Sequence, residues 1–248
     1  MKTNTYNYVF GPIISRRLGR SLGIDVVPFK TCTYDCIYCQ LGATPQCTLE
    51  RSEYVPLHDI LDELDRKLAS QPNADYVSIA GSGEPTLYSR LGELIAAIKA
   101  RTQTPVAVIT NGSLLWDRNV QEDLLQADLV IPNLDAATPE AFIEINRQHA
   151  DLTFEKMLQG LIDFRNRFRG QIWLEVFVLA NITDSDAHTQ HLAKIVSQIH
   201  PDKVQLNTMA RPAPGTNAQP VTRERLAEIA AVLGPIAEII AQDTQPTK

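Results

Sequence analysis

Residues 32–40 read CTYDCIYCQ, and the place of this stretch in the chain indicates both the fold and the kind of site. Cys32, Cys36 and Cys39 follow a CxxxCxxC spacing, with aromatic residues between them. Zinc sites, disulfides and iron–sulfur clusters all use cysteine, so the spacing alone leaves three alternatives open. The choice between them depends on what else the chain supplies.

The composition narrows these alternatives. The chain has 248 residues, of which 44% are hydrophobic and 21% charged, and no apolar run approaches the roughly 18 residues of a membrane span. The N-terminus lacks the features of a secretory signal, so we expect a cytoplasmic protein with no membrane partner. In that reducing compartment, three crowded cysteines out of four indicate a metal centre rather than disulfides. The net charge of -6 provides no overall basic field for nucleic acid.

Short runs rich in β-branched residues alternate with amphipathic segments, which is typical of repeated βα units in a parallel sheet. Strands are predicted over residues 21–28, 76–81, 105–110, 128–134, 172–179 and 202–208. Helices are predicted over residues 57–70, 91–103, 118–127, 139–145, 154–168, 185–199 and 223–240. Six βα units fall short of the eight that close a full barrel, so the predicted fold class is α/β, a partial (β/α)6 TIM-like open barrel of parallel strands.

The chain shows no convincing linker, and we therefore expect one domain over residues 1–248. Residues 1–20 form an N-terminal segment of this domain, and residues 209–248 supply a loop, a helix and a tail. Ligands of parallel α/β sheets bind at the carboxyl ends of the strands. Those ends carry the cysteine loop, then GSGEP, TNGS, NLDA and LNT, in chain order.

These residues are compatible with two kinds of metal centre. A structural zinc ion needs four ligands, and Cys47 is the one further thiolate available. Three cysteines on a cubane [4Fe–4S] cluster would instead leave one iron free for a ligand that is not protein.

The cysteine motif, its position after the first predicted strand and the later Gly-Glu-Pro strand end together resemble the radical S-adenosylmethionine (radical SAM) superfamily over residues 20–208. The resemblance implies that Cys32, Cys36 and Cys39 bind a [4Fe–4S] cluster whose unique iron chelates SAM. It also implies an enzyme that cleaves SAM reductively to a 5′-deoxyadenosyl radical, which then abstracts hydrogen from a substrate.

The same resemblance assigns further residues to SAM. Tyr38 resembles the aromatic residue whose backbone lies against the adenine, and the GSGEP segment resembles a motif that binds the SAM amino group. That segment is Gly81, Ser82, Gly83, Glu84 and Pro85, with Ser82 as a departure from the usual glycine arrangement. The polar strand ends that resemble contacts to the SAM carboxylate, ribose or adenine, or the lining of the substrate cavity, are Asn111, Ser113, Asn133, Asp135 and Asn207. Glu84 is alternatively a carboxylate at a helix N-terminus, and the other polar residues are alternatively turn or helix-cap residues.

These residues leave the specific reaction open. The motif CxxDCxYCQLG and its flanks resemble a compact group near the wyosine-forming tRNA enzymes, so tRNA-nucleotide modification is one alternative, and activation of a glycyl-radical enzyme is another. Arg16, Arg17 and Arg20 indicate an anionic substrate, which is an RNA nucleotide or a small metabolite. The electron donor would be a reductant such as flavodoxin or ferredoxin. The rival class is a zinc-stabilised, non-catalytic α/β binding protein that uses Cys47.

Two further patterns predict the orientation of side chains. Trp173 and Glu175 alternate along the fifth predicted strand, and we expect one to face the barrel interior and the other to face the helices. His188 and His191 are expected on an exposed polar face of a helix rather than on a metal.

Overall fold

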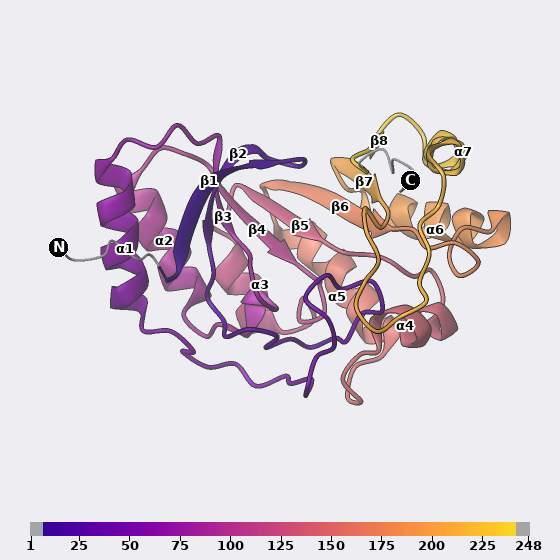
Figure 1. The fold of residues 1–248 in the computed structure, drawn as a ribbon, viewed down its shortest axis with the longest axis horizontal. Helices are drawn as coiled ribbons and strands as arrows, with labels where there is room; N and C mark the ends of the chain where they lie inside the picture. The colour runs from indigo at the N-terminus through magenta and orange to yellow at the C-terminus, as the bar shows by residue number, and fades with distance from the viewer. Residues whose placement is uncertain (1–6, 242–248) are drawn as a thin grey trace.

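The computed structural model describes residues 7–241, which form one curved sheet of eight strands flanked by helices (Figure 1). The strands lie in the order β1 to β8 across the sheet. β1 pairs with β2 in an antiparallel hairpin, and every later neighbouring pair is parallel. The bounds are β1 Val9–Ser15, β2 Gly19–Ile24, β3 Tyr76–Ile79, β4 Val106–Thr110, β5 Leu129–Pro132, β6 Gln171–Phe177, β7 Lys203–Asn207 and β8 Ala237–Ile239. The predicted α/β fold with an open sheet of parallel strands is confirmed, and the antiparallel pairing of β1 is an addition to it.

Strands β2 to β7 correspond to the six predicted strands, and two more strands extend the sheet. β1 comes from the N-terminal segment, where no strand was predicted. β8 comes from the last predicted helix, which was wrong beyond Leu233. Gly234 ends that helix with a backbone φ of +85° and Pro235 follows, so the chain leaves the helix and adds a parallel edge strand. The predicted tail over residues 242–248 lies outside the described residues.

Seven helices connect the parallel strands of the described chain, and most begin at the residue types that favour helix starts. The side chains of Asp117, Thr138, Thr153, Ser185 and Thr222 each accept a hydrogen bond from a backbone N–H in the first turn. The bounds are α1 Leu57–Ala69, α2 Leu91–Arg101, α3 Arg118–Leu124, α4 Pro139–Asn146, α5 Phe154–Arg167, α6 Asp186–Ile199 and α7 Arg223–Leu233, with a short 3₁₀ helix at Pro85–Leu87. None of these helices has the length and apolar character needed to cross a membrane.

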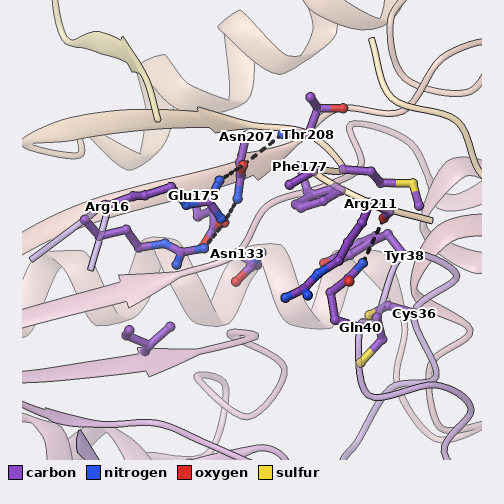
Figure 2. Close-up of a pocket in the computed structure, with 15 residues that line it drawn as sticks. Arg16, Cys36, Tyr38, Gln40, Asn133, Glu175, Phe177, Asn207, Thr208 and Arg211 are labelled. Atoms are coloured by element: carbon purple, nitrogen blue, oxygen red, sulfur yellow. Dashed lines mark hydrogen bonds and ion pairs between the residues drawn. The ribbon is translucent and has the colours of Figure 1, made fainter. Parts of the chain in front are cut away.

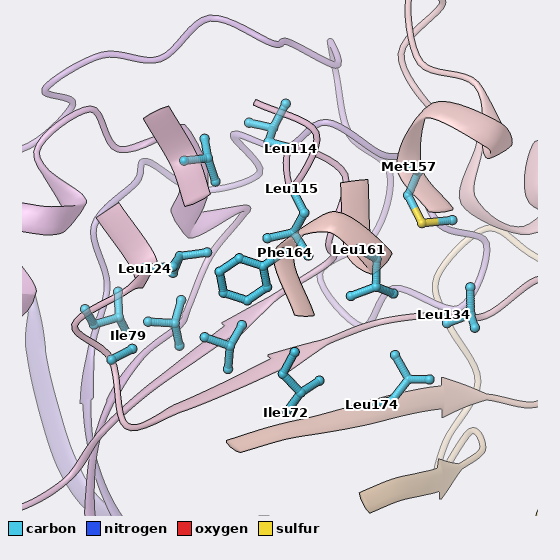
Figure 3. Packing of buried hydrophobic residues seen from close by; sticks show 14 of the residues in the cluster. Ile79, Leu114, Leu115, Leu124, Leu134, Met157, Leu161, Phe164, Ile172 and Leu174 are labelled. Carbon is cyan, nitrogen blue, oxygen red and sulfur yellow. The ribbon is translucent and has the colours of Figure 1, made fainter. Parts of the chain in front are cut away.

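The two faces of the sheet differ because side chains alternate along each strand. On the outer face, Ile172 and Leu174 of β6 pack in one cluster with Leu161 and Phe164 of α5 (Figure 3). On the inner face, Leu18, Ala107, Leu129, Ile131 and Trp173 form a separate small cluster. Trp173 and Glu175 are two positions apart and both lie on the inner side, so the expectation that they face opposite ways was wrong: a period of two puts them on the same face.

The barrel stays open between its first and last strands, since β1 pairs with β2 and β8 with β7. The turn between β1 and β2 spans part of this gap with side chains. Arg16 Nη1 donates to the carbonyl of Ile240, just after β8, at 3.4 Å. Leu18, from the same turn, is buried against Trp173 in the barrel interior. The N-terminal hairpin therefore covers a side of the barrel that strand pairing leaves open.

Candidate active site

The cysteine loop follows β2 and is held by backbone hydrogen bonds to the end of α4. The N–H groups of Asp35 and Ile37 donate to the carbonyls of Asn146 and Ile145 at 3.0 and 2.9 Å. The N–H of Cys39 donates to the carbonyl of Cys36 at 3.0 Å, which makes a tight turn between two of the cysteines. All four cysteines of the chain are free thiols and partly buried. This loop thus has a fixed backbone, with its thiols not engaged in disulfides.

Each of the three clustered sulfurs has a nitrogen donor beside it. Lys30 Nζ lies 3.2 Å from Cys39 Sγ, Asn146 Nδ2 lies 3.4 Å from Cys36 Sγ, and Asn111 Nδ2 lies 3.6 Å from Cys32 Sγ. Hydrogen bonds to cysteine sulfurs are a main way in which proteins stabilise and tune iron–sulfur clusters. Three thiol ligands with such donors fit an iron–sulfur group. Among residues 7–241, no group of three His, Cys, Asp or Glu side chains has a geometry that could hold a single metal ion.

Burial makes these thiols hard to ionise on their own. Burial, with a smaller contribution from the Glu84 carboxylate, raises the pKa of Cys32 to about 12. Burial also raises the pKa of Cys36 well above its ordinary value, and the charge of Asp135 adds to the effect. Thiolates at these positions therefore need a local positive charge, which iron ions supply when they bind.

The segment Gly81 to Pro85, at the end of β3, packs directly against the start of the cysteine loop. The N–H of Glu84 donates to the carbonyl of Thr31 at 2.9 Å, and the N–H of Lys30 donates to the carbonyl of Ser82 at 2.7 Å. A Cβ atom on Gly83 would lie 1.9 Å from the Thr31 oxygen. Glycine is needed there because the two backbones approach so closely.

Ser82 and Gly81 face a carboxylate rather than open space. The N–H and hydroxyl of Ser82 donate to Asp25 Oδ2 at 3.0 and 2.5 Å, and a Cβ on Gly81 would meet the same carboxylate at 2.3 Å. Asp25 directly follows β2, so it ties the end of β3 to the strand that leads into the cysteine loop.

Glu84 is buried, and its carboxylate is surrounded by donors from the protein itself. Oε1 accepts from the N–H and hydroxyl of Thr86 at 2.9 and 2.6 Å and from the hydroxyl of Thr110 at 2.5 Å. Oε2 accepts from the N–H of Asn111 at 2.7 Å. Glu84 thus caps the 3₁₀ helix that begins at Pro85. This is the role at a helix N-terminus that the sequence analysis gave as the alternative to SAM binding. The same hydrogen bonds also link the ends of β3 and β4.

Asn111 and Ser113, after β4, lie behind the cysteine loop. The Asn111 amide donates to Thr33 Oγ1 at 2.7 Å, and the hydroxyls of Ser113 and Thr33 lie 2.7 Å apart. Asn111 Oδ1 accepts from the N–H of Ser113 at 2.9 Å, which is an Asx-type turn. Both residues therefore hold Thr33, the neighbour of Cys32.

Asp135, which follows β5, is buried next to the Tyr38 hydroxyl. Its carboxylate accepts hydrogen bonds from the Tyr38 hydroxyl, from Asn146 Nδ2 at 3.0 Å and from Asn133 Nδ2 at 3.2 Å, and burial raises its pKa. The Tyr38 ring stacks on Phe177 of β6, with ring centroids 4.0 Å apart and planes 10° from parallel. Tyr38 is thus fixed at both its ring and its hydroxyl.

A cavity of about 640 Å³ opens between the cysteine loop, Ile109 of β4, Asn133 after β5 and the inner face of β6 and β7 (Figure 2). Of the residues that the sequence assigned to the cluster or to SAM, it brings together Cys36, Tyr38, Cys39, Asn133 and Asn207. The predicted residues that do not line this cavity are Cys32, Gly81, Ser82, Gly83, Glu84, Pro85, Asn111, Ser113 and Asp135. The other residues of its wall are Arg16, Arg17, Gln40, Ile109, Glu175, Phe177, Thr208, Met209, Ala210 and Arg211.

The cavity wall farthest along the barrel from the cysteines is charged. Arg17 of the β1–β2 turn forms an ion pair with the buried Glu175, whose Oε1 also accepts from Asn207 Nδ2 at 2.9 Å. Arg16 Nη1 lies 3.4 Å from Asn207 Oδ1. Arg20, grouped with these two in the sequence analysis, instead pairs with Asp75 at 2.8 Å on the exposed surface. The expected three-arginine group is therefore wrong for Arg20.

Several residues of this site were missed by the sequence analysis. Lys30 lies two positions before Cys32, and Arg211 lies just after β7, so both sit near strand ends where the sequence directs attention. Phe177 ends β6, and its contact with Tyr38 requires the pairing of distant segments. Asn146 is the last residue of α4 and carries no sequence signal that connects it with Cys36.

The fold and this site define an α/β protein with a cysteine-lined cavity at the carboxyl ends of parallel strands. A sequence model described as the radical SAM superfamily matches residues 26–193, which is more than half of the chain. The chain belongs to the radical SAM superfamily. Membership supports SAM-cleaving radical chemistry by an enzyme that uses SAM and an iron–sulfur cluster, as well as the need for a reductant and a substrate.

Two named relatives match most of this chain. The chain is 36% identical over 229 residues to a UPF0026 protein of Methanocaldococcus jannaschii, covering 92% of this chain and 71% of that protein. It is 48% identical over 218 residues to a protein named GTPase Obg of Brachyspira hyodysenteriae, covering 88% of this chain but 32% of that protein, so the chain spans about a third of that relative.

Among solved structures, TYW1 with a lysine–pyruvate adduct bound superposes with a TM-score of 0.64 at 17% identity, over 88% of this chain and 74% of that chain. This likeness is one of fold. The expected similarity to the wyosine-forming enzymes is confirmed at that level.

Proposed function

We propose that Cys32, Cys36 and Cys39 hold a [4Fe–4S] cluster beside the 640 Å³ cavity and that SAM binds within this cavity. When bound, the cluster and SAM supply a 5′-deoxyadenosyl radical, formed with methionine by reductive cleavage, for hydrogen abstraction from a substrate. One observation carries the proposal: the cysteine loop and the carboxyl ends of β5 and β7 converge on a single cavity.

The protein residues bind, orient and shield in this proposal. The nitrogen donors of Lys30, Asn111 and Asn146 stabilise the charge on the three sulfurs. Tyr38, held flat against Phe177, provides the wall on which we place the adenine. The amides of Asn133 and Asn207 are the polar groups that we assign to the rest of SAM, because both line the cavity.

The predicted SAM contacts that lie outside the cavity wall receive a supporting role. We infer that Glu84 acts as a positioning residue, because its carboxylate is already engaged by Thr86, Thr110 and Asn111. Its contacts fix Asn111, which in turn reaches Cys32. Asp135 fixes Tyr38 in the same way, and Ser113 fixes Thr33. Binding of the SAM amino group by the backbone of Gly81 to Pro85 stays a prediction.

We also propose the domain organisation, the cellular location and the reductant of this protein. Residues 1–248 are proposed as one core domain, supported by the continuous eight-stranded sheet. A cytoplasmic location is supported by four unpaired cysteines, and a flavodoxin or ferredoxin is the proposed reductant. Modification of a tRNA nucleotide and activation of a glycyl-radical enzyme remain alternative reactions.

Metal analysis tests the cluster proposal against the zinc alternative. Protein reconstituted anaerobically with iron and sulfide is expected to be brown, to lose iron in Cys36→Ala and to keep it in Cys47→Ala. Cys47 is the matched control, because within residues 7–241 its sulfur hydrogen-bonds to the carbonyl of Arg147, at 3.9 Å, and not to Lys30, Asn111 or Asn146. A colourless protein with one zinc per chain that is lost in Cys47→Ala would contradict the proposal.

A further inference from the structure

The arginines on the cavity wall differ in their partners. Arg17 is neutralised by Glu175, whereas Arg16 has only neutral acceptors, the oxygens of Asn207 and Ile240, both at 3.4 Å. Within residues 7–241, the Arg211 guanidinium has no carboxylate within ion-pair distance. Figure 2 shows the Arg211 side chain extending from the loop after β7 into the cavity, on the side opposite Arg16.

Many arginines away from the cavity are, in contrast, paired with acids. These pairs include Arg20–Asp75, Arg51–Asp123, Arg90–Glu53, Arg101–Asp65, Arg165–Asp202, Arg167–Glu122 and Arg225–Asp186. The unpaired cationic groups of the cavity are therefore not a general property of this surface. The Arg16 and Arg211 side chains are both exposed on the cavity wall, so a bound anion could reach either guanidinium without displacing a protein carboxylate.

The electrostatics of Arg16 show the same excess of positive charge. Partial burial and the neighbouring Arg17 lower the pKa of Arg16, and the Glu175 carboxylate offsets only part of this effect. This end of the cavity therefore holds two guanidinium groups and one carboxylate, and that carboxylate is paired with Arg17. A second negative group placed there would restore the balance.

We propose that the cavity binds a small substrate whose carboxylate or phosphate group pairs with the Arg16 guanidinium, with Arg211 as a second cation on the facing wall. The proposal rests on the function proposed above, because it concerns the substrate of the same cavity. A guanidinium presents a planar fork of donors that matches the oxygens of either anion. Arg17 positions this end of the cavity through Glu175 and does not itself receive the anion.

A small molecule fits these observations better than RNA. RNA-binding proteins neutralise many phosphates along a basic stripe, and their affinity falls steeply with salt. Here the net charge is -6, and many surface cations are already paired. The cavity of about 640 Å³ must also hold SAM, which leaves limited room beside it.

Equilibrium dialysis of the anaerobic, reconstituted protein tests the proposal without SAM turnover. The probes are radiolabelled inorganic phosphate and, separately, radiolabelled acetate, at an ionic strength held constant with sodium chloride. We expect Arg16→Gln to raise the Kd of the bound anion about tenfold or more, as for loss of a charge-assisted hydrogen bond, and Arg16→Lys to restore part of the affinity. Binding of phosphate alone would identify a phosphorylated substrate, and binding of acetate would identify a carboxylate.

Matched variants keep the test decisive. Arg101→Gln removes a paired surface arginine and is expected to leave the Kd unchanged. Should Arg16→Gln fail to fold, Arg211→Gln, in an exposed loop, must weaken the same anion. The proposal would be overturned if the wild type and the cavity variants bound the anion equally, or if neither anion bound. It would also be overturned if a short RNA bound in a salt-sensitive way and with the same affinity in Arg16→Gln. Because 5′-deoxyadenosine formation is assayed separately, failure here leaves the proposed SAM chemistry intact.

Discussion

Arg17 and Glu175, 158 positions apart in the sequence, form an ion pair inside the barrel. Arg17 belongs to the turn between β1 and β2, and Glu175 to the inner face of β6. Only 3% of the Glu175 side chain is exposed, so Arg17 and Asn207 take the place of water as partners of its carboxylate. The pair connects the N-terminal hairpin to the far side of a barrel that strand pairing does not close.

Removing Arg17 is therefore expected to destabilise the fold. Arg17→Gln leaves the buried Glu175 carboxylate without its counter-charge, which costs about 3 kcal/mol of unfolding free energy. Urea unfolding measures this loss. Arg20→Gln, which breaks the exposed pair with Asp75, is the control and should cost far less. Equal losses in the two variants would contradict the role given to the Arg17–Glu175 pair.

Gly83 is expected to accept no side chain. In Gly83→Ala the new Cβ would meet the Thr31 carbonyl, a backbone atom, so relief of the clash requires the cysteine loop to move. We expect a loss of about 3 kcal/mol and reduced iron content after reconstitution. Gly92→Ala is a milder comparison, because its Cβ would first meet a side-chain oxygen of Asp123. Normal iron content in Gly83→Ala would show that the two loops are not packed as described.

Glu84→Gln separates the positioning role of Glu84 from direct binding of SAM. The Glu84 carboxylate accepts four hydrogen bonds from N–H and O–H groups of the protein. The NH₂ group of a glutamine side chain would therefore face one of these donors, at a cost of about 2 kcal/mol. We expect a lower Tm, with the exposed Glu93→Gln as a control that leaves the Tm nearly unchanged. An unchanged Tm together with a raised KM for SAM would instead identify Glu84 as a ligand contact.

His188 is expected to make the protein sensitive to acid. Contrary to expectation, it is buried, and burial together with the charge of His191 lowers its pKa from 6.5 to about 4. The unfolded chain then binds a proton at higher pH than the folded protein, so stability at this site is complete above pH 6.5 and is lost as pH falls toward 4.

His188→Gln tests this by reducing the loss of stability on acidification. Between pH 7 and pH 5 the wild type should lose about 2 kcal/mol more than His188→Gln in urea unfolding. The exposed His58→Gln should behave like the wild type. An identical pH dependence in wild type and His188→Gln would rule out the proposed contribution.

The sequence predicted the six central strands because their β-branched runs and alternating helices are strong local signals. It missed β1, whose pattern is interrupted by Pro12, and β8, which is three residues long and follows an uninterrupted-looking helical period. An edge strand this short forms only because β7 is there to pair with it.

Some residues of the candidate site could likewise be predicted from the sequence, and some of its contacts could not. The cysteines, Tyr38 and Asn133 follow strands, Asn207 ends one, and all were found by their position in the sequence. The contacts of Asp25 with Ser82, of Asn146 with Cys36 and of Arg17 with Glu175 each join segments more than 50 residues apart. Such contacts are set by how the loops pack in three dimensions. Hydrophobic periodicity and motif spacing carry no information about that packing.

The most direct test of the account is an anaerobic assay for 5′-deoxyadenosine, with protein reconstituted in iron and sulfide, reduced with dithionite and supplied with SAM. We predict that the wild type and Cys47→Ala form 5′-deoxyadenosine and that Cys32→Ala, Cys36→Ala and Cys39→Ala do not. Absence of a cluster and of SAM cleavage in the wild type, with stoichiometric zinc in the purified protein, would contradict the radical SAM function proposed for this chain.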